Sequence, residues 1–204
     1  MKKTLRKNIE RGVLFGLVCA ILLSFARFEA KCQELRDGVL RLHILANSDS
    51  TADQQLKLKV RDKILEVTAS EFQSAGNIDD AIIIANGNMD KIIDAAKEVI
   101  AKEGYSYSVS ADVEENFFEN REYDDFTLPA GVYNSLTVRI GCAQGHNWWC
   151  VVFPGICLPA AQKSTLKNAV STGSAKVAKN ASKYKMGFKT VEIYEKIKYK
   201  ISKK

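Results

Sequence analysis

The stretch Gly38-Val-Leu-Arg-Leu-His-Ile-Leu-Ala-Asn-Ser-Asp-Ser50 decides the fold. From Leu40 to Ala46 apolar residues alternate with Arg41 and His43, which is the two-residue period of a β-strand. The four residues that follow are Asn, Ser, Asp and Ser, and such residues end strands and cap helices. We therefore expect a strand that leads directly into a helix.

Helices are predicted after this strand. Apolar residues recur every three to five positions after Ser50 and predict a helix of about five turns. Asn77 and Asn88 are candidate N-caps of two further helices, which we expect to end at Gly87 and Gly104. These three helices should cover one face of a sheet.

The two-residue period returns farther along the chain. Residues 105–113 are predicted to form a second strand, and residues 117–126 a short strand or an ordered loop. Residues 132–141 and 148–153 are two apolar runs that flank a turn at residues 142–147. We expect these two runs to pair as a β-hairpin.

The order of strand, helices and antiparallel strands predicts an α+β fold. In this two-layer domain, residues 36–159, about three helices cover a mostly antiparallel sheet. Residues 160–187 are rich in Ala, Ser, Lys and Asn and are expected to be a low-complexity linker, mobile or marginally helical. Residues 188–204 predict an amphipathic C-terminal helix that docks on the domain, on a membrane or on a partner.

The N-terminus has the pattern of a targeting segment. Five basic residues precede an apolar run at residues 12–26, which is shorter than the roughly 20 residues of a spanning helix. Ser24 and Ala26 place small residues where signal peptidase requires them for a cut after Ala26. We expect residues 1–26 to be a signal peptide, with an uncleaved N-terminal anchor as the alternative.

The net charge of +6 is unevenly distributed along the chain. Residues 27–159 carry 13 basic and 21 acidic side chains, whereas residues 160–204 carry 12 lysines and two glutamates. The folded part therefore has the wrong sign for a nucleic-acid partner. The Lys-rich tail either contacts a membrane or wall polymer or is a solvated segment.

The cysteines suggest a disulfide rather than a metal site. An exported chain can form disulfides, and Cys142, Cys150 and Cys157 are close enough in sequence for one bridge among them. Their pairing stays open at this point. Their spacing matches no metal-ligand pattern, so we expect neither a metal nor another cofactor.

Several stretches together resemble the stage II sporulation protein R family: residues 40–50, 58–62, 128–133 and 145–154, the last containing Asn-Trp-Trp-Cys. The chain departs from the family pattern at Gly155 and in the Lys-rich part of the tail. The resemblance implies a protein made in the forespore and secreted across its membrane into the intermembrane space. It also implies a partner, a membrane-embedded aspartic protease that matures the sigma-E precursor.

A candidate partner-binding site combines the polar loop after the first strand with the turn before the last one. It consists of Asn47, Ser48, Asp49, Ser50, Gln144, His146, Asn147, Trp148 and Trp149. The loop has a simpler explanation as a helix cap, and the two tryptophans as core residues. On a strand the tryptophans point to opposite faces, so we expect one in the core and the other nearer to solvent, where it could anchor an interface.

Two alternatives to a binding protein remain. His43 or His146 could activate Cys150 or Cys157 in an exported thiol hydrolase, although apolar neighbours would raise the pKa of the Cys150 thiol. Alternatively, residues 160–204 could serve a structural protein of the wall or membrane. We favour the binding protein and expect no catalytic residues.

Overall fold

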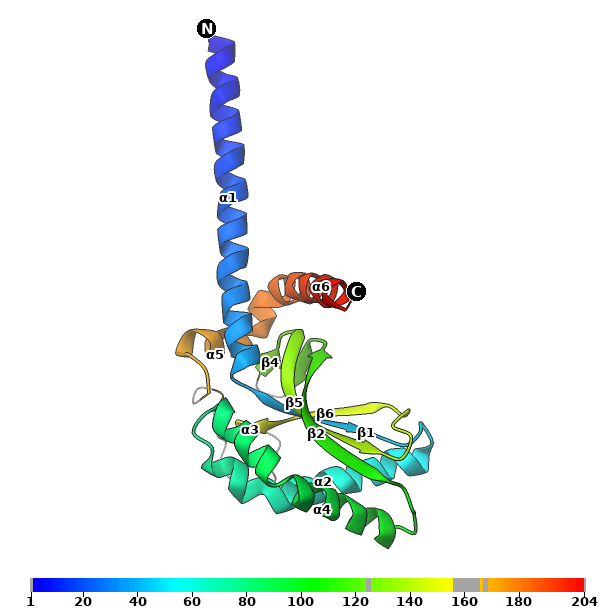
Figure 1. The fold of residues 1–204 in the computed structure, drawn as a ribbon. Helices are drawn as coiled ribbons and strands as arrows, with labels where there is room; N and C mark the ends of the chain where they lie inside the picture. The colour runs from blue at the N-terminus through cyan, green and yellow to red at the C-terminus, as the bar shows by residue number, and fades with distance from the viewer. Residues whose placement is uncertain (1, 124–125, 156–165, 167–168, 204) are drawn as a thin grey trace.

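The computed structural model describes residues 2–123, 126–155, 166 and 169–203. A single helix, α1 (Lys2–Asp37), projects from an α+β domain (Figure 1). By length and composition it could cross a membrane, a property shared by signal sequences. The apolar N-terminal helix is thus consistent with a signal segment or an anchor.

The centre of the domain is a four-stranded sheet in the order β2-β5-β1-β6. Its strands are β1 (Leu40–Leu45), β2 (Val109–Phe118), β5 (Gly131–Ile140) and β6 (Asn147–Phe153). The β1–β5 pair is parallel, and the β2–β5 and β1–β6 pairs are antiparallel. A separate antiparallel pair joins β3 (Arg121–Tyr123) to β4 (Phe126–Leu128). The prediction of a mostly antiparallel sheet in an α+β fold is confirmed.

The predicted hairpin is wrong in its pairing. Both apolar runs are strands, but β1 lies between β5 and β6 and pairs with each of them. The reason is the burial of both faces of β1, since all of Leu40–Ile44 is buried, including Arg41 and His43. A strand buried on both faces suits the middle of a sheet rather than its edge.

Helices α2 (Thr51–Ser74), α3 (Ile78–Gly87) and α4 (Met89–Lys102) cover one face of the sheet (Figure 1), as predicted. Their apolar faces share a core with alternate residues of the strands. That core includes Leu42, Ile44, Leu136, Val138, Val60, Ile64, Ile92 and Ala96. Helix α2 is longer than the five turns expected, because buried Thr68 and Phe72 extend its packed face.

The opposite face of the sheet carries a second core, which the sequence did not predict. It contains Leu35 of α1, Tyr133 of β5 and Val151 of β6, together with Ala175 and Ala178 of α5 (Thr172–Lys179). The segment expected as a low-complexity linker therefore includes a packed helix. Its alanines bury little area each, but their small size allows α5 to lie close against its neighbours. Residues 160–165 and 167–168 of that segment lie outside the described part.

A 3-10 turn (Ala181–Tyr184) connects α5 to the C-terminal helix α6 (Lys185–Ser202). The predicted amphipathic helix thus begins three residues earlier than expected. One side of α6 docks on the domain through Phe188 and Val191, which form a small core with Cys32 and Val177. Because Cys32, Leu35 and Arg36 are buried, the last turns of α1 belong to the folded domain.

Candidate partner-binding site

The predicted loop and turn lie side by side in the structure. Because β1 and β5 are parallel, both end at the same edge of the sheet, and β6 begins there. The backbone N–H groups of Gln144 and Gly145 donate to the carbonyl oxygens of Asn47 and Ala46, at 3.3 and 3.0 Å. Two segments about 95 residues apart thus form one surface.

Asp53 of α2 holds the loop Asn47–Ser50 in place through hydrogen bonds. Its carboxylate accepts hydrogen bonds from Asn47 Nδ2 at 2.9 Å and from Ser48 Oγ at 2.5 Å. Its backbone N–H donates to Ser50 Oγ at 3.1 Å, so Ser50 is the N-cap predicted from the sequence. The Ser48 hydrogen bond is the main reason that the pKa of Asp53 lies below its usual value. The simpler explanation of the loop as a helix cap therefore holds for Ser50, and it leaves Asp49 free to face the turn.

Asp49 links the loop to the turn. Its Oδ1 lies 2.5 Å from both the backbone N and the Nδ1 of His146. This interaction lowers the pKa of Asp49. Lys57, whose side chain is buried under the turn, donates to the carbonyl oxygen of His146 at 2.7 Å. Loop and turn are therefore fixed relative to each other by side chains from three elements.

Two glycines allow this close approach. Gly141 has a φ of 57°, which side chains rarely adopt, and it lies against Asn47. A Cβ on Gly145 would overlap the carbonyl oxygen of Ser48. The sequence reasoning had assigned no role to either glycine.

The resulting polar patch is exposed. We define it as Asn47–Ser50 together with Gln144, His146 and Asn147; of these, Asn47 and Ser48 are half-buried and the others are exposed. The patch lies at the end of the sheet remote from α1, since β1 starts next to α1 and runs away from it (Figure 1). It is therefore a preformed surface of hydrogen-bonding groups that projects away from the N-terminal helix.

The two tryptophans lie on opposite faces, as expected, but both are half-buried. Trp148 packs against the helical side, where the Arg61 guanidinium lies 4.5 Å from its ring. Trp149 stacks on His43 with ring centroids 3.9 Å apart and meets Phe118 at 4.5 Å. Both rings therefore belong first to the packing of the domain.

Arg41 and His43 occupy the second core, where sequence reasoning expected only an outward face. The Arg41 guanidinium lies 4.0 Å from the Phe118 ring centre and donates to Tyr123 Oη at 3.0 Å. Burial lowers the pKa of His43, so its neutral form is favoured. Both side chains are buried, with exposures of 1% and 6%.

The cysteines do not form a catalytic pair in the described part of the chain. Cys150 is disulfide-bonded, Cys142 is free and exposed, and Cys157 lies outside the described residues. A disulfide sulfur has no thiolate with which to attack a substrate. In addition, Cys150 lies opposite Leu42 in the β1–β6 ladder and contributes to the helical-side core, whereas His43 faces the other side.

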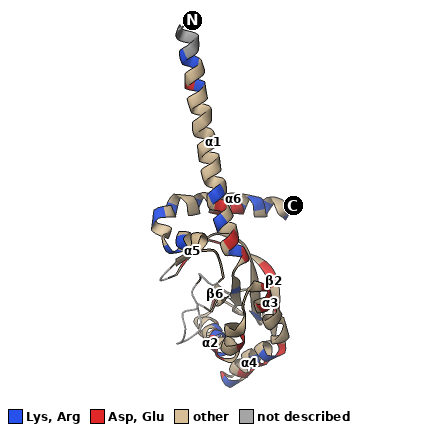
Figure 2. Ribbon diagram, turned by 90° about the vertical axis from the view of Figure 1, so that its left-hand side faces the viewer, with Lys and Arg blue, Asp and Glu red and all other residues tan. Residues whose placement is uncertain are grey.

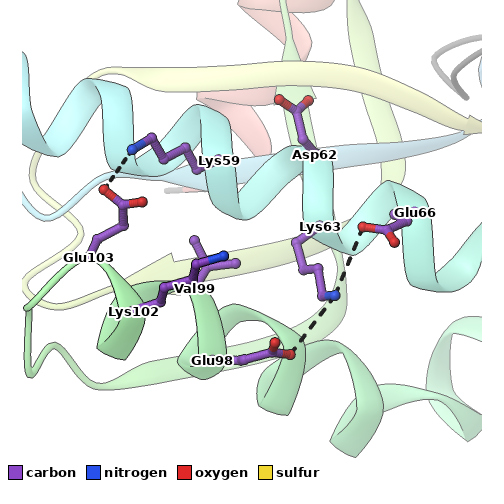
Figure 3. Close-up of a pocket in the computed structure, with 8 residues that line it drawn as sticks. All are labelled: Lys59, Asp62, Lys63, Glu66, Glu98, Val99, Lys102 and Glu103. Atoms are coloured by element: carbon purple, nitrogen blue, oxygen red, sulfur yellow. Dashed lines mark hydrogen bonds and ion pairs between the residues drawn. The ribbon is translucent and has the colours of Figure 1, made fainter.

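A shallow groove lies between α2 and α4 (Figure 3). It has a volume of about 380 Å³ and is lined almost entirely by charged side chains. Lys59 pairs with Glu103 at 2.5 Å, and Lys63 lies 3.9 Å from both Glu66 and Glu98. Three lysines and four carboxylates line the groove, and Val99 is its one apolar side chain, unlike the mostly apolar lining of a typical small-molecule site. Among the described residues, no cluster of three or more His, Cys, Asp or Glu could hold a metal ion.

The fold and the patch define a class: an α+β domain on an apolar N-terminal helix, with a rigid polar surface at its far end. The profile of the family described as Stage II sporulation protein R matches residues 36–164. Stage II sporulation protein R of Bacillus subtilis (strain 168) is 34% identical over 163 residues, which cover 77% of this chain and 71% of that protein. This chain belongs to the Stage II sporulation protein R family and has a role in sporulation. No solved structure matches it.

Proposed function

We propose that the chain is an exported signalling protein that binds a membrane-embedded aspartic protease and activates it, so that the sigma-E precursor of the mother cell is processed. The observation that carries the proposal is the polar patch, in which Asp49 and His146 join two distant segments into one exposed surface. The family and the apolar helix α1 support a sporulation role and export.

The rigidity of the patch suits an activator. A binding protein can switch a protease only by binding its active arrangement more tightly than its inactive one. A shift of about 100-fold requires about 2.7 kcal/mol of differential affinity. A surface already fixed by Asp53 and Lys57 loses little conformational entropy on binding, so a small interface is sufficient.

The direction of the patch also supports signalling between membranes. With α1 retained as an anchor in the forespore membrane, the far end of the domain points into the intermembrane space (Figure 1). In this arrangement the patch meets a protease in the opposite membrane without a rearrangement of the domain.

The test is a reconstituted activation assay with single substitutions in the patch. The chain, the candidate protease and the sigma-E precursor are produced together, and processing is followed by immunoblot. Asp49→Ala and Gln144→Ala should each reduce processing at least about tenfold, which corresponds to about 1.4 kcal/mol of lost binding. The matched control is Asp94→Ala, which removes an exposed carboxylate from α4 and should leave processing unchanged.

A binding measurement separates this proposal from other sporulation roles. The purified chain should capture the protease in detergent, and Asp49→Ala should weaken the capture in parallel with processing. Normal processing by folded Asp49→Ala and Gln144→Ala proteins would show that the patch is not the interface.

A further inference from the structure

Helix α6 has apolar residues on two opposite sides. Phe188, Val191, Glu192 and Glu195 are buried against the domain. At about 100° per residue, Ile193, Ile197 and Ile201 fall on the side facing away from it. Their exposed fractions are 53%, 55% and 69%, and Tyr194 next to them is 44% exposed. The exposed stripe, defined by Ile193, Tyr194, Ile197 and Ile201, is therefore not used in folding the domain.

The position of α6 relates this stripe to α1. Figures 1 and 2 show α6 beside α1, roughly perpendicular to it, where that helix leaves the domain. Phe28 of α1 meets Phe188 at 5.4 Å, whereas Tyr194 meets Phe25, at 5.8 Å and almost one turn nearer the N-terminus. The stripe thus faces toward the apolar run at residues 12–26, whose large apolar side chains are exposed.

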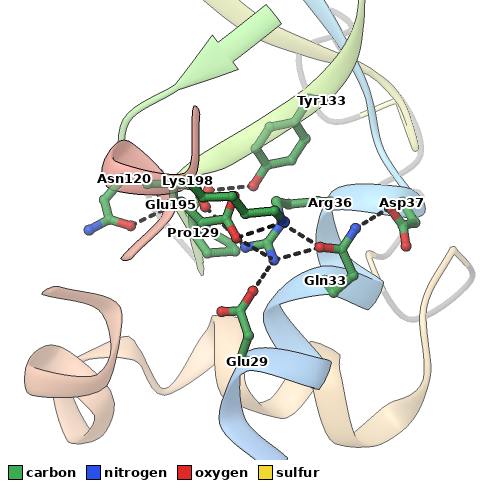
Figure 4. A network of polar contacts seen from close by, with 10 residues as sticks. Glu29, Gln33, Arg36, Asp37, Asn120, Pro129, Tyr133, Glu195 and Lys198 are labelled. Atoms are coloured by element: carbon green, nitrogen blue, oxygen red, sulfur yellow. Dashed lines mark hydrogen bonds and ion pairs between the residues drawn. The ribbon is translucent and has the colours of Figure 1, made fainter. Parts of the chain in front are cut away.

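Polar contacts fix α6 in this orientation (Figure 4). Buried Glu195 lies 3.7 Å from Arg36, which also pairs with Glu29 of α1. Asn120 donates to Glu192 at 2.8 Å on the domain side. Because both carboxylates of α6 are held on the side that faces the domain, the helix cannot turn its stripe toward the domain without breaking these contacts.

The charge of α6 suits an anionic surface. Helix α6 carries five lysines against two glutamates, and three of the lysines, Lys196, Lys198 and Lys200, lie within the length of the stripe; Lys189, Lys196 and Lys198 also pair with the glutamates, and Figure 2 shows basic residues along the helix. Helices with one apolar side and lysines around it lie in the plane of a membrane interface, with the apolar side chains among the lipid chains. Tyrosine is also typical of that interface, and basic residues favour anionic lipids.

We propose that α6 is a second membrane contact, which lies flat on the anionic bilayer that α1 enters and places the Ile193–Ile201 stripe among its lipids. A bilayer that holds residues 12–26 of α1 has its surface near Phe25, where Tyr194 lies. The contact sets the orientation of the domain on the membrane. It also survives a cut after Ala26, because Phe28, Cys32 and Arg36 still hold α6.

The experiment uses the full chain in nanodiscs of phosphatidylcholine and phosphatidylglycerol. Ile197→Cys is introduced with Cys19→Ser and Cys142→Ser and labelled with the environment-sensitive fluorophore NBD. The same protein without the added cysteine gives the background. The matched control is Ile83→Cys, an exposed isoleucine at 69% on α3, which covers the face of the sheet that carries α2 and α4. Nitroxide-labelled lipids should quench the label at position 197 at least about threefold more than the label at position 83.

Equal quenching at the two positions would overturn the proposal. So would shielding of position 197 that occurs only in nanodiscs holding two chains, because the stripe would then join two copies of the protein. Ile193→Asp together with Ile201→Asp, in the chain labelled at position 197, should abolish the difference in quenching while the circular dichroism spectrum stays unchanged. The readout needs no protease, so the result is independent of the proposed activation.

Discussion

At the scale of single residues, Asp53 supports both the start of helix α2 and the polar patch. Its carboxylate is only 4% exposed and binds Asn47 and Ser48 of the loop, while its N–H is capped by Ser50. The first turn of a helix favours a negative charge, which adds to these hydrogen bonds. Loss of the charge should therefore weaken both the helix start and the patch.

The pH dependence of stability follows from this carboxylate. Because the pKa of Asp53 in the folded chain lies below its ordinary value of 3.8, the unfolded chain binds more protons in acid. Its contribution is present above about pH 4 and is lost as the pH falls through the folded pKa. We expect the free energy of unfolding to fall between about pH 6 and about pH 3, and to fall less steeply in Asp53→Asn. Denaturant titrations followed by tryptophan fluorescence measure both slopes, and parallel slopes would contradict the assignment.

Gly145 is a second residue whose contribution to stability can be tested by a single substitution. In Gly145→Ala the new methyl group would overlap the Ser48 carbonyl, so the turn and the loop must separate. We expect a loss of about 1–3 kcal/mol in unfolding free energy, as for other overpacked sites. Gly87→Ala is the control, since a Cβ there meets nothing within 4 Å and should change stability by less than about 1 kcal/mol. Equal effects of the two substitutions would show that the close approach is not required.

At the scale of elements, the buried arginine at the end of α1 joins three parts of the fold. Arg36 donates to the Ala130 carbonyl at 3.0 Å and to Gln33 at 2.7 Å, and it lies next to Glu29 and Glu195 (Figure 4). Removal of one partner from such a buried network leaves the other charges uncompensated. The network therefore couples the docking of α1 to that of α6.

We expect Arg36→Ala to lower the free energy of unfolding by about 3–5 kcal/mol. Lys59→Ala removes a lysine from the surface pair with Glu103, in which the lysine is 53% exposed, and should cost less than about 1 kcal/mol. Thermal or denaturant unfolding of the two variants in the same detergent gives the comparison. Similar losses of unfolding free energy in the two variants would mean that Arg36 contributes no more than a surface ion pair and does not hold α1 and α6 together.

Elements with strong local signals were predictable from the sequence, whereas their partners were not. Ser50 and Asn77 cap α2 and α3 through their side chains, as local chemistry indicates. The insertion of β1 between β5 and β6 depends on contacts about 100 residues apart, which no local pattern records. The packing of helix α5 was not predicted, because its small alanines indicate close packing only when the neighbouring helix is known.

The candidate site was predictable to a similar extent. The polar loop and the turn were each visible as segments, and the parallel pairing of β1 with β5 is what joins them. The supporting Lys57 was missed because a lysine in a helix is normally exposed, whereas this one is 3% exposed beneath the turn. Proline and glycine predict turns, but they do not indicate which distant segment a turn contacts, so the contact between Gly145 and Ser48 could not be predicted.

At the scale of the whole molecule, the domain boundary lies inside α1 rather than at its end. The family profile begins at residue 36, and sequence reasoning placed the domain start at the same residue. In the structure Cys32, Leu35 and Arg36 are buried in two different cores and one polar network. Residues 6–24 are largely exposed. One continuous helix thus contains both the apolar run at residues 12–26 and the first part of the folded domain.

Two truncations test this division of α1. A chain that begins at Arg27 loses only the Phe25–Tyr194 ring contact, so its unfolding free energy should fall by no more than about 1.5 kcal/mol. A chain that begins at Gly38 also loses Leu35 and Arg36, which leaves a cavity and removes the buried cation beside Glu195, and we expect a loss of more than about 5 kcal/mol. Denaturant unfolding compares the two. Equal stability of the two truncated chains would place the domain boundary after α1. A large difference would mean that a cut after Ala26 releases a complete domain, which is compatible both with a cleaved signal peptide and with an uncleaved anchor.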